Sequence, residues 1–502
     1  MSVWYENTVF YHMYPLGMSG APFENKEEQV VHRFAELERW LPHIRSLECG
    51  AIYIGPLFES TSHGYDTRDY TVVDRRLGDN EDFQRFVKKA HGLGMKVVVD
   101  GVFNHTGREF FAFRDIQKNR EGSRYCGWYK GINFWGNNPY NDGFGYEAWR
   151  NCFELVNLNL QNREVKDYLF DVIRFWIREF DIDGIRLDCA DCLDFDFMRE
   201  MRWMTANEKK DFWLMGEVIH GDYSRWANAD MLHSVTNYEL HKGLYSGHND
   251  HNYFEIAHTI RRLFDGNGGL CRGRALYSFV DNHDVDRIVS KLNDKRHLKS
   301  VYTLLYTLPG VPSIYYGSEW GIEGRKANGG DPALRPRLVL EEMEKHPPMP
   351  GLEEFLIFLG KCRREYPVIG EGTYRELLLT TRQYAFARIG QGQTAIVMVN
   401  NDDQAATHSV PLPCRAQRII DPAAGVTLDL ADGKWKAEAT PGLADGKWKA
   451  EMMPGLADGK WNAGVTPGLA DGEQTAGTFT FENGKLSAVT APGEGRIFIV
   501  EG

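Results

Sequence analysis

Short apolar runs alternate with longer amphipathic stretches through the first 365 residues of the chain. Runs rich in β-branched and aromatic residues predict buried strands, and the stretches between them predict helices. The clearest helix covers 164–180, where Val165, Leu169, Val172 and Trp176 recur at steps of three and four residues. The predicted strands are 9–14, 51–54, 96–102, 184–188, 212–217, 234–238, 276–280 and 313–316.

Eight strands with interleaved helices predict an α/β fold of the (β/α)8 TIM-barrel type. The connection after the third strand is too long for an ordinary loop, and its Gly, Asn, Tyr and Trp content predicts a small inserted lobe. After about residue 370, short alternating strands follow without helices, which predicts a C-terminal antiparallel β-sandwich. The predicted domains are the barrel at 1–105 and 157–369, the lobe (domain B) at 106–156 and the sandwich at 370–502.

The last domain contains a tandem repeat of 13 residues at about 430–472. The repeat places Trp435, Trp448 and Trp461 in equivalent positions, and a row of exposed indoles could stack on sugar rings. The alternative is a duplication that lengthens a hairpin loop. We favour the duplication, because long surface insertions cost little free energy.

Composition narrows the class of protein. The 502 residues contain 58 Lys and Arg against 70 Asp and Glu, a net charge of −12, which argues against binding nucleic acid or anionic membranes. The first residues lack the features of a signal peptide, and no apolar run reaches the roughly 18 residues of a membrane span, so we expect a cytoplasmic protein. Eight irregularly spaced cysteines indicate free thiols. An aromatic content of 13% suits sugar binding.

Carboxylates end three of the predicted strands. Asp188, Glu217 and Asp284 follow strands four, five and seven, and the active sites of TIM barrels lie at these strand ends. Like charges in a desolvated cleft raise one another's pKa, so one carboxyl can stay protonated while another stays ionised. Retaining glycoside hydrolysis needs such a pair about 5–5.5 Å apart. The strand ends therefore predict a glycoside hydrolase site.

Six ordered motifs around these positions resemble the α-amylase family, glycoside hydrolase family thirteen. The resemblance implies the same barrel, inserted lobe and C-terminal sandwich. Within the family, LVNLN and His220 are most similar to the cyclomaltodextrinase, neopullulanase and maltogenic amylase group. The six motifs are DGVFNH (100–105), LVNLN (155–159), GIRLDCADC (184–192), GEVIHG (216–221), FVDNHD (279–284) and GVPSIYYGSEWG (310–321).

The resemblance also implies a role for each site residue. Asp188 is expected to be the nucleophile, Glu217 the general acid and base, and Asp284 the carboxylate that holds sugar hydroxyls and stabilises the transition state. Arg186 lies two residues before Asp188 on the same strand face, where its cation would keep the nucleophile ionised. The implied substrate-binding residues are His63, Tyr65, His105 and His283, together with Arg186.

The chain departs from the family pattern in several places. Asp191 and Cys192 stand where many members have Lys-His, which puts the subsites on the leaving-group side in doubt. Cys189 and Cys192 form a single Cys-X-X-Cys, which without a second pair is weak evidence for a redox or zinc site. Many close relatives have Trp at the place of Ile219. Ser62 replaces the Asp that exo-glucosidases of the family tend to carry there.

We expect no metal ligands and no required cofactor. Some relatives bind calcium through the residue equivalent to Asn104, but the other oxygen ligands cannot be identified in the short lobe, so calcium is not favoured. The expected partner is an α-glucan oligosaccharide, with no nucleic acid and no membrane. The oligomeric state is left open, including a homo-oligomer.

The combined evidence predicts a retaining hydrolase of α-1,4-glucosidic bonds in maltooligosaccharides, cyclodextrins or related α-glucans. One alternative is an α-glucan transglycosylase, either a 4-α-glucanotransferase or a trehalose-forming enzyme, in which a sugar hydroxyl replaces water. A more distant alternative is a non-catalytic carbohydrate-binding member of the fold. Such proteins typically lose a catalytic carboxylate, and this chain keeps all three.

Overall fold

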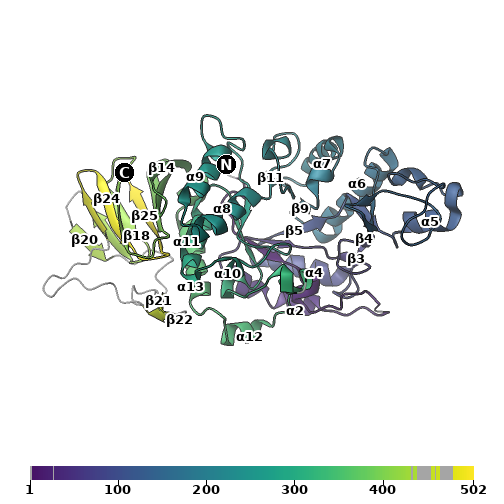
Figure 1. Ribbon diagram of the computed structural model, residues 1–502, viewed down its shortest axis with the longest axis horizontal. Coiled ribbons are helices and arrows are strands. Elements are labelled where there is room, and N and C mark those ends of the chain that lie inside the picture. Colours follow the sequence, from purple (N-terminus) through teal and green to yellow (C-terminus); the bar gives the residue numbers. More distant parts are fainter. Residues whose placement is uncertain are drawn as a thin grey trace.

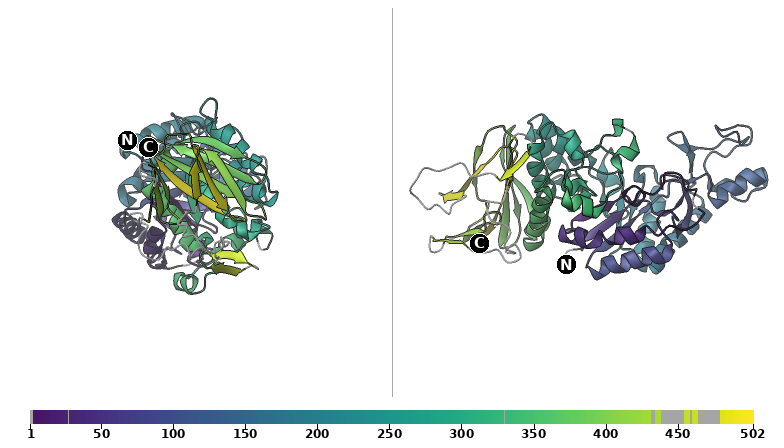
Figure 2. Two further views of the ribbon diagram at one scale, coloured as in Figure 1. Left: turned by 90° about the vertical axis from the view of Figure 1, so that its left-hand side faces the viewer. Right: turned by 90° about the horizontal axis from the view of Figure 1, so that it is seen from below.

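The computed structural model of the chain describes residues 3–26, 28–328, 330–430, 434–437, 454–457, 460–463 and 479–502. It has three parts arranged along one long axis (Figure 1). A β-rich part lies at one end, the strand–helix units lie in the middle, and a small lobe around helix α5 (Phe111–Asn119) lies at the other end. Figure 2 shows the same order from below, with the lobe projecting away from the β-rich end.

The middle part is the predicted barrel. Its eight strands pair in parallel in the order β11-β10-β9-β5-β2-β1-β13-β12. A further parallel bridge between Thr236 and Tyr277 joins the two ends of this sheet, so the ring closes. The prediction of an α/β TIM barrel is thereby confirmed. The strands are β1 (Phe10–Met13), β2 (Ala51–Ile54), β5 (Lys96–Gly101), β9 (Gly184–Leu187), β10 (Trp213–Gly216), β11 (Ser234–Val235), β12 (Tyr277–Phe279) and β13 (Val311–Tyr315).

Large aromatic side chains fill the inside of the barrel. Phe10, Tyr53, Trp213, Tyr277 and Phe279 form one buried cluster, and the rings of Phe10 and Trp213 have centroids 4.9 Å apart. Inward-facing side chains of neighbouring strands pack in this way in every TIM barrel, so the interior is a core and not a channel. This packing leaves space for ligands only above the carboxyl ends of the strands.

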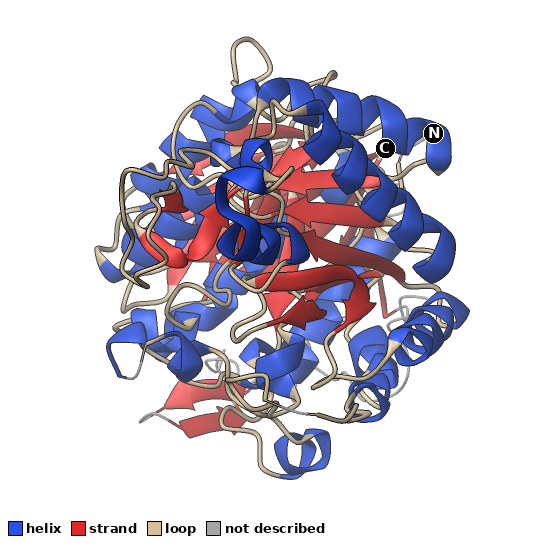
Figure 3. Cartoon of the chain, turned by 90° about the vertical axis from the view of Figure 1, so that its right-hand side faces the viewer, coloured by secondary structure: helices blue, strands red, loops and turns tan. Residues whose placement is uncertain are grey.

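Helices surround the strands, as Figure 3 shows. Helix α6 (Arg163–Phe180) begins at Asn162, whose side-chain oxygen accepts a hydrogen bond from the backbone N–H of Glu164 at 2.9 Å. The apolar face predicted for 164–180 is buried. The other helices of the barrel are α1 (Pro15–Met18), α2 (Phe34–Glu38), α3 (Leu41–Ser46), α4 (Asn80–Gly92), α7 (Phe195–Glu208), α8 (Tyr238–Asn249), α9 (Tyr253–Phe264), α10 (Ile288–Lys291), α11 (Leu298–Thr307), α12 (Leu340–Lys345), α13 (Leu352–Glu365) and α14 (Val368–Glu371).

Strand β11 is shorter than the predicted strand 234–238. The side chain of Asn237 accepts a hydrogen bond from the backbone N–H of Leu240 at 3.1 Å, so it caps helix α8, which begins at Tyr238. The helix cap ends the strand after Val235. The apolar pattern alone did not distinguish the strand from the first turn of the helix.

The inserted lobe leaves the barrel after β5. Its three-stranded sheet has the order β6-β8-β7, with β6 (His105–Gly107), β8 (Cys152–Asn157) and β7 (Ala148–Trp149). A second excursion, the hairpin of β3 (Phe58–Ser60) and β4 (Thr67–Val73), follows β2 and carries the loop with His63 and Tyr65. Both excursions start at the carboxyl ends of barrel strands, so they stand around the mouth of the barrel.

Among the described residues, the C-terminal part contains a seven-stranded and a three-stranded antiparallel sheet, as expected for a sandwich, together with the small hairpin of β21 and β22. Helix α11 of the barrel packs against β16 and β25. The repeat at about 430–472 lies mostly outside the described residues, and so do the side chains of Trp435, Trp448 and Trp461. The strands are β14 (Thr373–Leu379), β15 (Gln383–Ile389), β16 (Gln393–Asn400), β17 (Ala406–Pro411), β18 (Arg418–Asp421), β19 (Val426–Asp429), β20 (Lys434–Ala437), β21 (Pro454–Ala457), β22 (Lys460–Ala463), β23 (Phe479–Glu482), β24 (Lys485–Thr490) and β25 (Gly495–Glu501).

Within the described part of the chain, every helix is either too short or too polar to cross a lipid bilayer.

Close strand contact at Gly184 gives a test of the barrel. A Cβ at this position of β9 would lie 2.6 Å from the carbonyl oxygen of Trp213 on β10. We expect Gly184→Ala to lower the free energy of unfolding by about 1–3 kcal/mol, because the strands must separate. Denaturant unfolding followed by circular dichroism measures this change.

Gly92→Ala is the matched control, since a Cβ on this helical glycine of α4 would meet no atom within 4 Å. This variant should be as stable as the wild type or more stable by roughly 0.5–1 kcal/mol. Equal stabilities for Gly184→Ala and Gly92→Ala would contradict the β9–β10 contact.

Candidate active site

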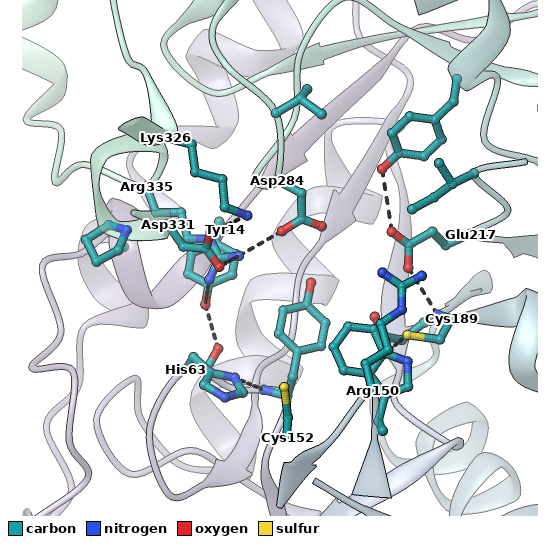
Figure 4. A pocket seen from close by; sticks show the side chains of 18 of the residues that line it. Tyr14, His63, Arg150, Cys152, Cys189, Glu217, Asp284, Lys326, Asp331 and Arg335 are labelled. Atoms are coloured by element: carbon teal, nitrogen blue, oxygen red, sulfur yellow. Dashed lines mark hydrogen bonds and ion pairs between the residues drawn. The ribbon is translucent and has the colours of Figure 1, made fainter. Parts of the chain in front are cut away.

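The three carboxylates lie together at the mouth of the barrel. Asp188 directly follows β9, Glu217 directly follows β10, and Asp284 lies five residues after β12. All three line one cavity of about 1220 Å³. Parallel strands end at the same edge of the sheet, which is why residues so far apart in sequence meet here. Figure 4 shows Glu217 and Asp284 on opposite sides of this cavity.

Arg186 on β9 holds three carboxylates at once. Its Nη1 donates to Asp100 Oδ1 and to Asp188 Oδ1, both at 2.9 Å, and its Nη2 lies 3.0 Å from Glu217 Oε2. The guanidinium is only 3% exposed, so these ion pairs are barely screened by water. Arginine stays protonated in proteins and presents several N–H groups in one plane, which suits it to this position.

Asp188 and Glu217 approach each other closely. A carboxylate oxygen of each residue and the Sγ of Cys189 all lie within 4.8 Å of one another. The backbone N–H of Cys189 donates to Glu217 Oε2 at 3.0 Å, and Cys189 has the left-handed backbone angle φ +45°. Few non-glycine residues adopt this region, and such positions often occur at functional sites. Here the turn directs the N–H of Cys189 toward Glu217.

Glu217 is a buried carboxyl with a raised pKa. Burial raises the pKa of Glu217 from its ordinary value of 4.5 to about 7. Arg186 opposes this shift, whereas the negative charges of Asp188 and Asp284 add to it. Near neutral pH, Glu217 can therefore exist in both its protonated and its ionised form, which is what a group that alternately donates and accepts a proton requires.

The pKa of Asp284 shifts in the opposite direction. Burial disfavours its charge, but His283 and Arg335 outweigh burial and hold the pKa of Asp284 well below its usual range. Arg335 Nη2 donates to Asp284 Oδ1 at 2.9 Å, and His283 Nε2 lies 3.1 Å from Asp284 Oδ2. Figure 4 shows Arg335 and Asp331 beside Asp284. Asp284 therefore stays ionised while Glu217 carries a proton.

The predicted substrate-binding residues separate into two groups. His63, Tyr65 and His105 line the cavity, and the Nε2 of His105 is buried without a hydrogen-bond partner among the residues that the structure describes. Arg186 and His283 are not among the lining residues and lie buried behind them. The Tyr65 hydroxyl bridges to this inner layer, 2.6 Å from His283 Nε2 and 3.2 Å from Asp100 Oδ2.

The family model for the alpha amylase catalytic domain matches residues 23–349. The chain belongs to the α-amylase family. It is a glycoside hydrolase of that family, as its motifs predicted.

Three known proteins show how similar this chain is to other proteins, two in sequence and one in structure. Neopullulanase 2 of Thermoactinomyces vulgaris is 34% identical over 74% of this chain and 63% of its own length. A cyclomaltodextrinase of Geobacillus thermopakistaniensis is 30% identical over 83% of this chain and 73% of its own length. Among solved structures, the cyclic α-maltosyl-(1→6)-maltose hydrolase of Arthrobacter globiformis has a TM-score of 0.71 and 25% identity, covering 81% of this chain and 94% of its own. The matched part of this chain thus spans about two thirds of the length of each of these two enzymes.

Several residues at the site of this α-amylase family member were not selected from its sequence. Arg335 and Asp331 lie in the segment after β13, and they line the cavity beside Asp284. Tyr238 places its hydroxyl 3.5 Å from Glu217 Oε1. Asp100 stood within a recognised motif, but only the fold shows that it shares Arg186 with Asp188. Arg335 and Asp331 could have been found by looking for charged residues after the eighth predicted strand. No sequence pattern marked Tyr238 as a site residue.

Asp188, Cys189 and Glu217 also form a group of possible metal ligands. Arg186 already forms ion pairs with both carboxylates. Burial, followed by the charges of Asp188 and Glu217, raises the pKa of the Cys189 thiol far above its usual range, so the thiolate that metals prefer is disfavoured. Asn104, which the family resemblance marked as a possible calcium ligand, places its Nδ2 3.3 Å from Asn157 Oδ1. That no cofactor is required stays a prediction.

Proposed function

We propose that this protein is a retaining hydrolase of α-1,4-glucosidic bonds in maltooligosaccharides, cyclodextrins or related α-glucans. The observation that carries the proposal is the spacing of Asp188 and Glu217, whose nearest carboxylate oxygens lie within 4.8 Å in one cavity. Retaining glycosidases have carboxyl groups about 5–5.5 Å apart, whereas inverting enzymes need about 6.5–9.5 Å to admit a water molecule. The spacing favours covalent attack by one carboxylate.

The two residues act in two steps. In the first step, protonated Glu217 gives its proton to the glycosidic oxygen while an Asp188 oxygen attacks the anomeric carbon. The carbon–oxygen bond breaks, its electron pair stays on the leaving sugar, and a glycosyl ester of Asp188 forms. In the second step, ionised Glu217 takes a proton from water, which attacks the same carbon and releases Asp188.

The surrounding residues prepare both steps. Arg186 binds Oδ1 of Asp188. The other oxygen, Oδ2, accepts a weak hydrogen bond from the Cys189 thiol at 3.2 Å and is the oxygen that can attack. Asp284 stays ionised and can hold sugar hydroxyls and stabilise the positive charge that develops on the sugar ring. The Tyr65 ring also lines the cavity and can offer the sugar an aromatic face.

The names of the relatives support an α-glucan substrate. Two of them are named for cyclomaltodextrins and pullulan, and the solved structure is named for a cyclic maltosyl-maltose. A cavity of about 1220 Å³ is large enough for several sugar units. The cytoplasmic location and the expectation that no cofactor is required stay predictions from the sequence.

Asp188→Asn tests the nucleophile. The amide cannot form the glycosyl ester, so we expect the rate of maltooligosaccharide hydrolysis to fall by about 10³-fold or more. Glu217→Gln should lower it by roughly 10²–10⁴-fold, because the proton donor is lost. Reducing-sugar release measures both changes.

Asp196→Asn is the matched control for these variants, since Asp196 is an exposed residue in the first turn of α7 and pairs only with Arg199 among described residues. It should keep wild-type activity. Near-normal hydrolysis by Asp188→Asn would refute the assigned nucleophile.

The pKa of Glu217 sets the pH dependence of the first step. Because that pKa is raised to about 7 and the protonated form is the donor, kcat/KM for maltooligosaccharides should decline as the pH rises through about 7. A substrate with fluoride as its leaving group needs no proton, so its kcat/KM should keep its value above pH 7. Initial rates from about pH 5 to about pH 9 check both. An alkaline limb that is identical for the two substrates would contradict the role of Glu217.

Product analysis tests both the stereochemistry and the choice of acceptor. We expect the first products to be α-anomers by proton NMR, since two displacements retain configuration. Maltotriose should yield glucose and maltose. Oligomers longer than maltotriose would establish the transglycosylase alternative, and β-anomeric products would exclude the covalent mechanism.

A further inference from the structure

Phe23 is an exposed aromatic residue on the wall of the substrate cavity. It lies in the segment after α1, and 62% of its surface is open to solvent although it lines the cavity. Exposing a phenylalanine costs hydrophobic free energy, which a single surface residue can tolerate. Phe23 differs from an ordinary surface residue in how its backbone is held.

A fully buried arginine anchors the segment that carries Phe23. Arg76 Nη1 donates to the carbonyl oxygens of Pro22 and Phe23 at 2.9 and 2.7 Å. Nε and Nη2 of this guanidinium form a bidentate pair with Asp74, at 2.8 and 2.7 Å, and neither side chain is exposed. A buried ion pair of this kind has a defined geometry and gives up little further entropy when a ligand binds.

The same guanidinium also holds the loop of Tyr65. Its Nη1 donates to the carbonyl oxygen of Ser62 at 2.7 Å, one residue before His63. On the other side of Phe23, the backbone N–H of Asn25 donates to the carbonyl oxygen of Thr61 at 2.9 Å. Phe23 is therefore fixed relative to the loop that presents Tyr65 to the reacting sugar.

Phe23 lies on the side of the cavity opposite the proton donor. Figure 4 shows His63, Tyr14 and Arg335 across the cavity from Glu217, and the Tyr14 hydroxyl donates to the carbonyl oxygen of His63 at 2.5 Å. Arg76 joins Phe23 to this same loop. Because Glu217 protonates the leaving group, the leaving part of the chain occupies the Glu217 side. The His63 side receives the non-reducing part.

We infer that Phe23 is the stacking platform of a further binding subsite, which takes an α-1,4-linked glucosyl unit on the non-reducing side of the reacting sugar. The apolar face of a glucose ring fits a flat phenyl ring. Arg76 is a positioning residue, since it fixes the Phe23 backbone without touching the sugar. This subsite makes the enzyme prefer substrates with a longer non-reducing part, and the inference depends on the proposed function.

A series of α-glycosyl fluorides isolates this side of the cavity. α-Glucosyl, α-maltosyl and α-maltotriosyl fluoride have the same leaving group and differ only in the length of the non-reducing part. We expect Phe23→Ala to lower kcat/KM for the longest fluoride by about tenfold and to leave that for α-glucosyl fluoride within about twofold of the wild type. Phe23→Tyr keeps a flat ring and is the matched control, with wild-type values throughout.

Arg76→Lys tests the anchor. A lysine cannot make the same set of bonds, so it should show the length-dependent loss of Phe23→Ala together with a loss common to all three fluorides, because Arg76 also holds the Tyr65 loop. The length dependence of the double variant should be little larger than that of either single variant, because both substitutions act on one platform. Circular dichroism verifies that each variant is folded.

The two proposals fail in different ways. Equal losses for all three fluorides in Phe23→Ala, or no loss for the longest, would overturn the Phe23 subsite. A wild-type protein that cleaves the fluorides but releases no sugar from maltohexaose would instead overturn the proposed α-1,4-glucan hydrolase.

Discussion

The ion pairs of Arg186 are the interaction on which the site depends. One buried guanidinium faces Asp100, Asp188 and Glu217, and unpaired carboxylates at such depth would cost several kcal/mol each in lost hydration. With Arg186 in place, the three acids can meet at the mouth of the barrel. The parallel strands of the barrel bring these three acids together, because β5, β9 and β10 are neighbours and end at the same edge of the sheet.

The single positive charge of Arg186 cannot neutralise every acid at this site. The carboxyls therefore differ in pKa. Burial raises the pKa of Glu217 to about 7 despite Arg186. Asp284 has its own cationic partner in Arg335, so burial is outweighed and its pKa is low. Two acids with different proton affinities in one cavity are what acid–base chemistry at a glycosidic bond needs. The positions of two arginines thus separate the roles of similar side chains.

Buried arginines also organise the rim of the cavity. Arg76 ties the Phe23 segment to the loop of His63 and Tyr65 through backbone carbonyl oxygens. Loops change conformation more readily than strands, so a substrate wall built from loops needs such anchors to keep its geometry. Buried arginines therefore pair with the acids at the catalytic centre and hold the loops that form the wall of the cavity.

The sequence by itself determined the barrel and the position of its three acids. Apolar runs at regular intervals required buried strands, and a carboxylate directly after such a run has to stand at the strand end, as Asp188 and Glu217 do. The apolar pattern was less informative at 234–238. It predicted one strand there, but Asn237 caps helix α8 and the strand ends at Val235. Only the tertiary structure decided the partners of these acids. Arg335, Tyr238 and Arg76 were not selected from the sequence, because their roles arise from contacts between residues distant in sequence. Burial and the distances between charges, which set the pKa of each carboxyl, exist only once the chain is folded.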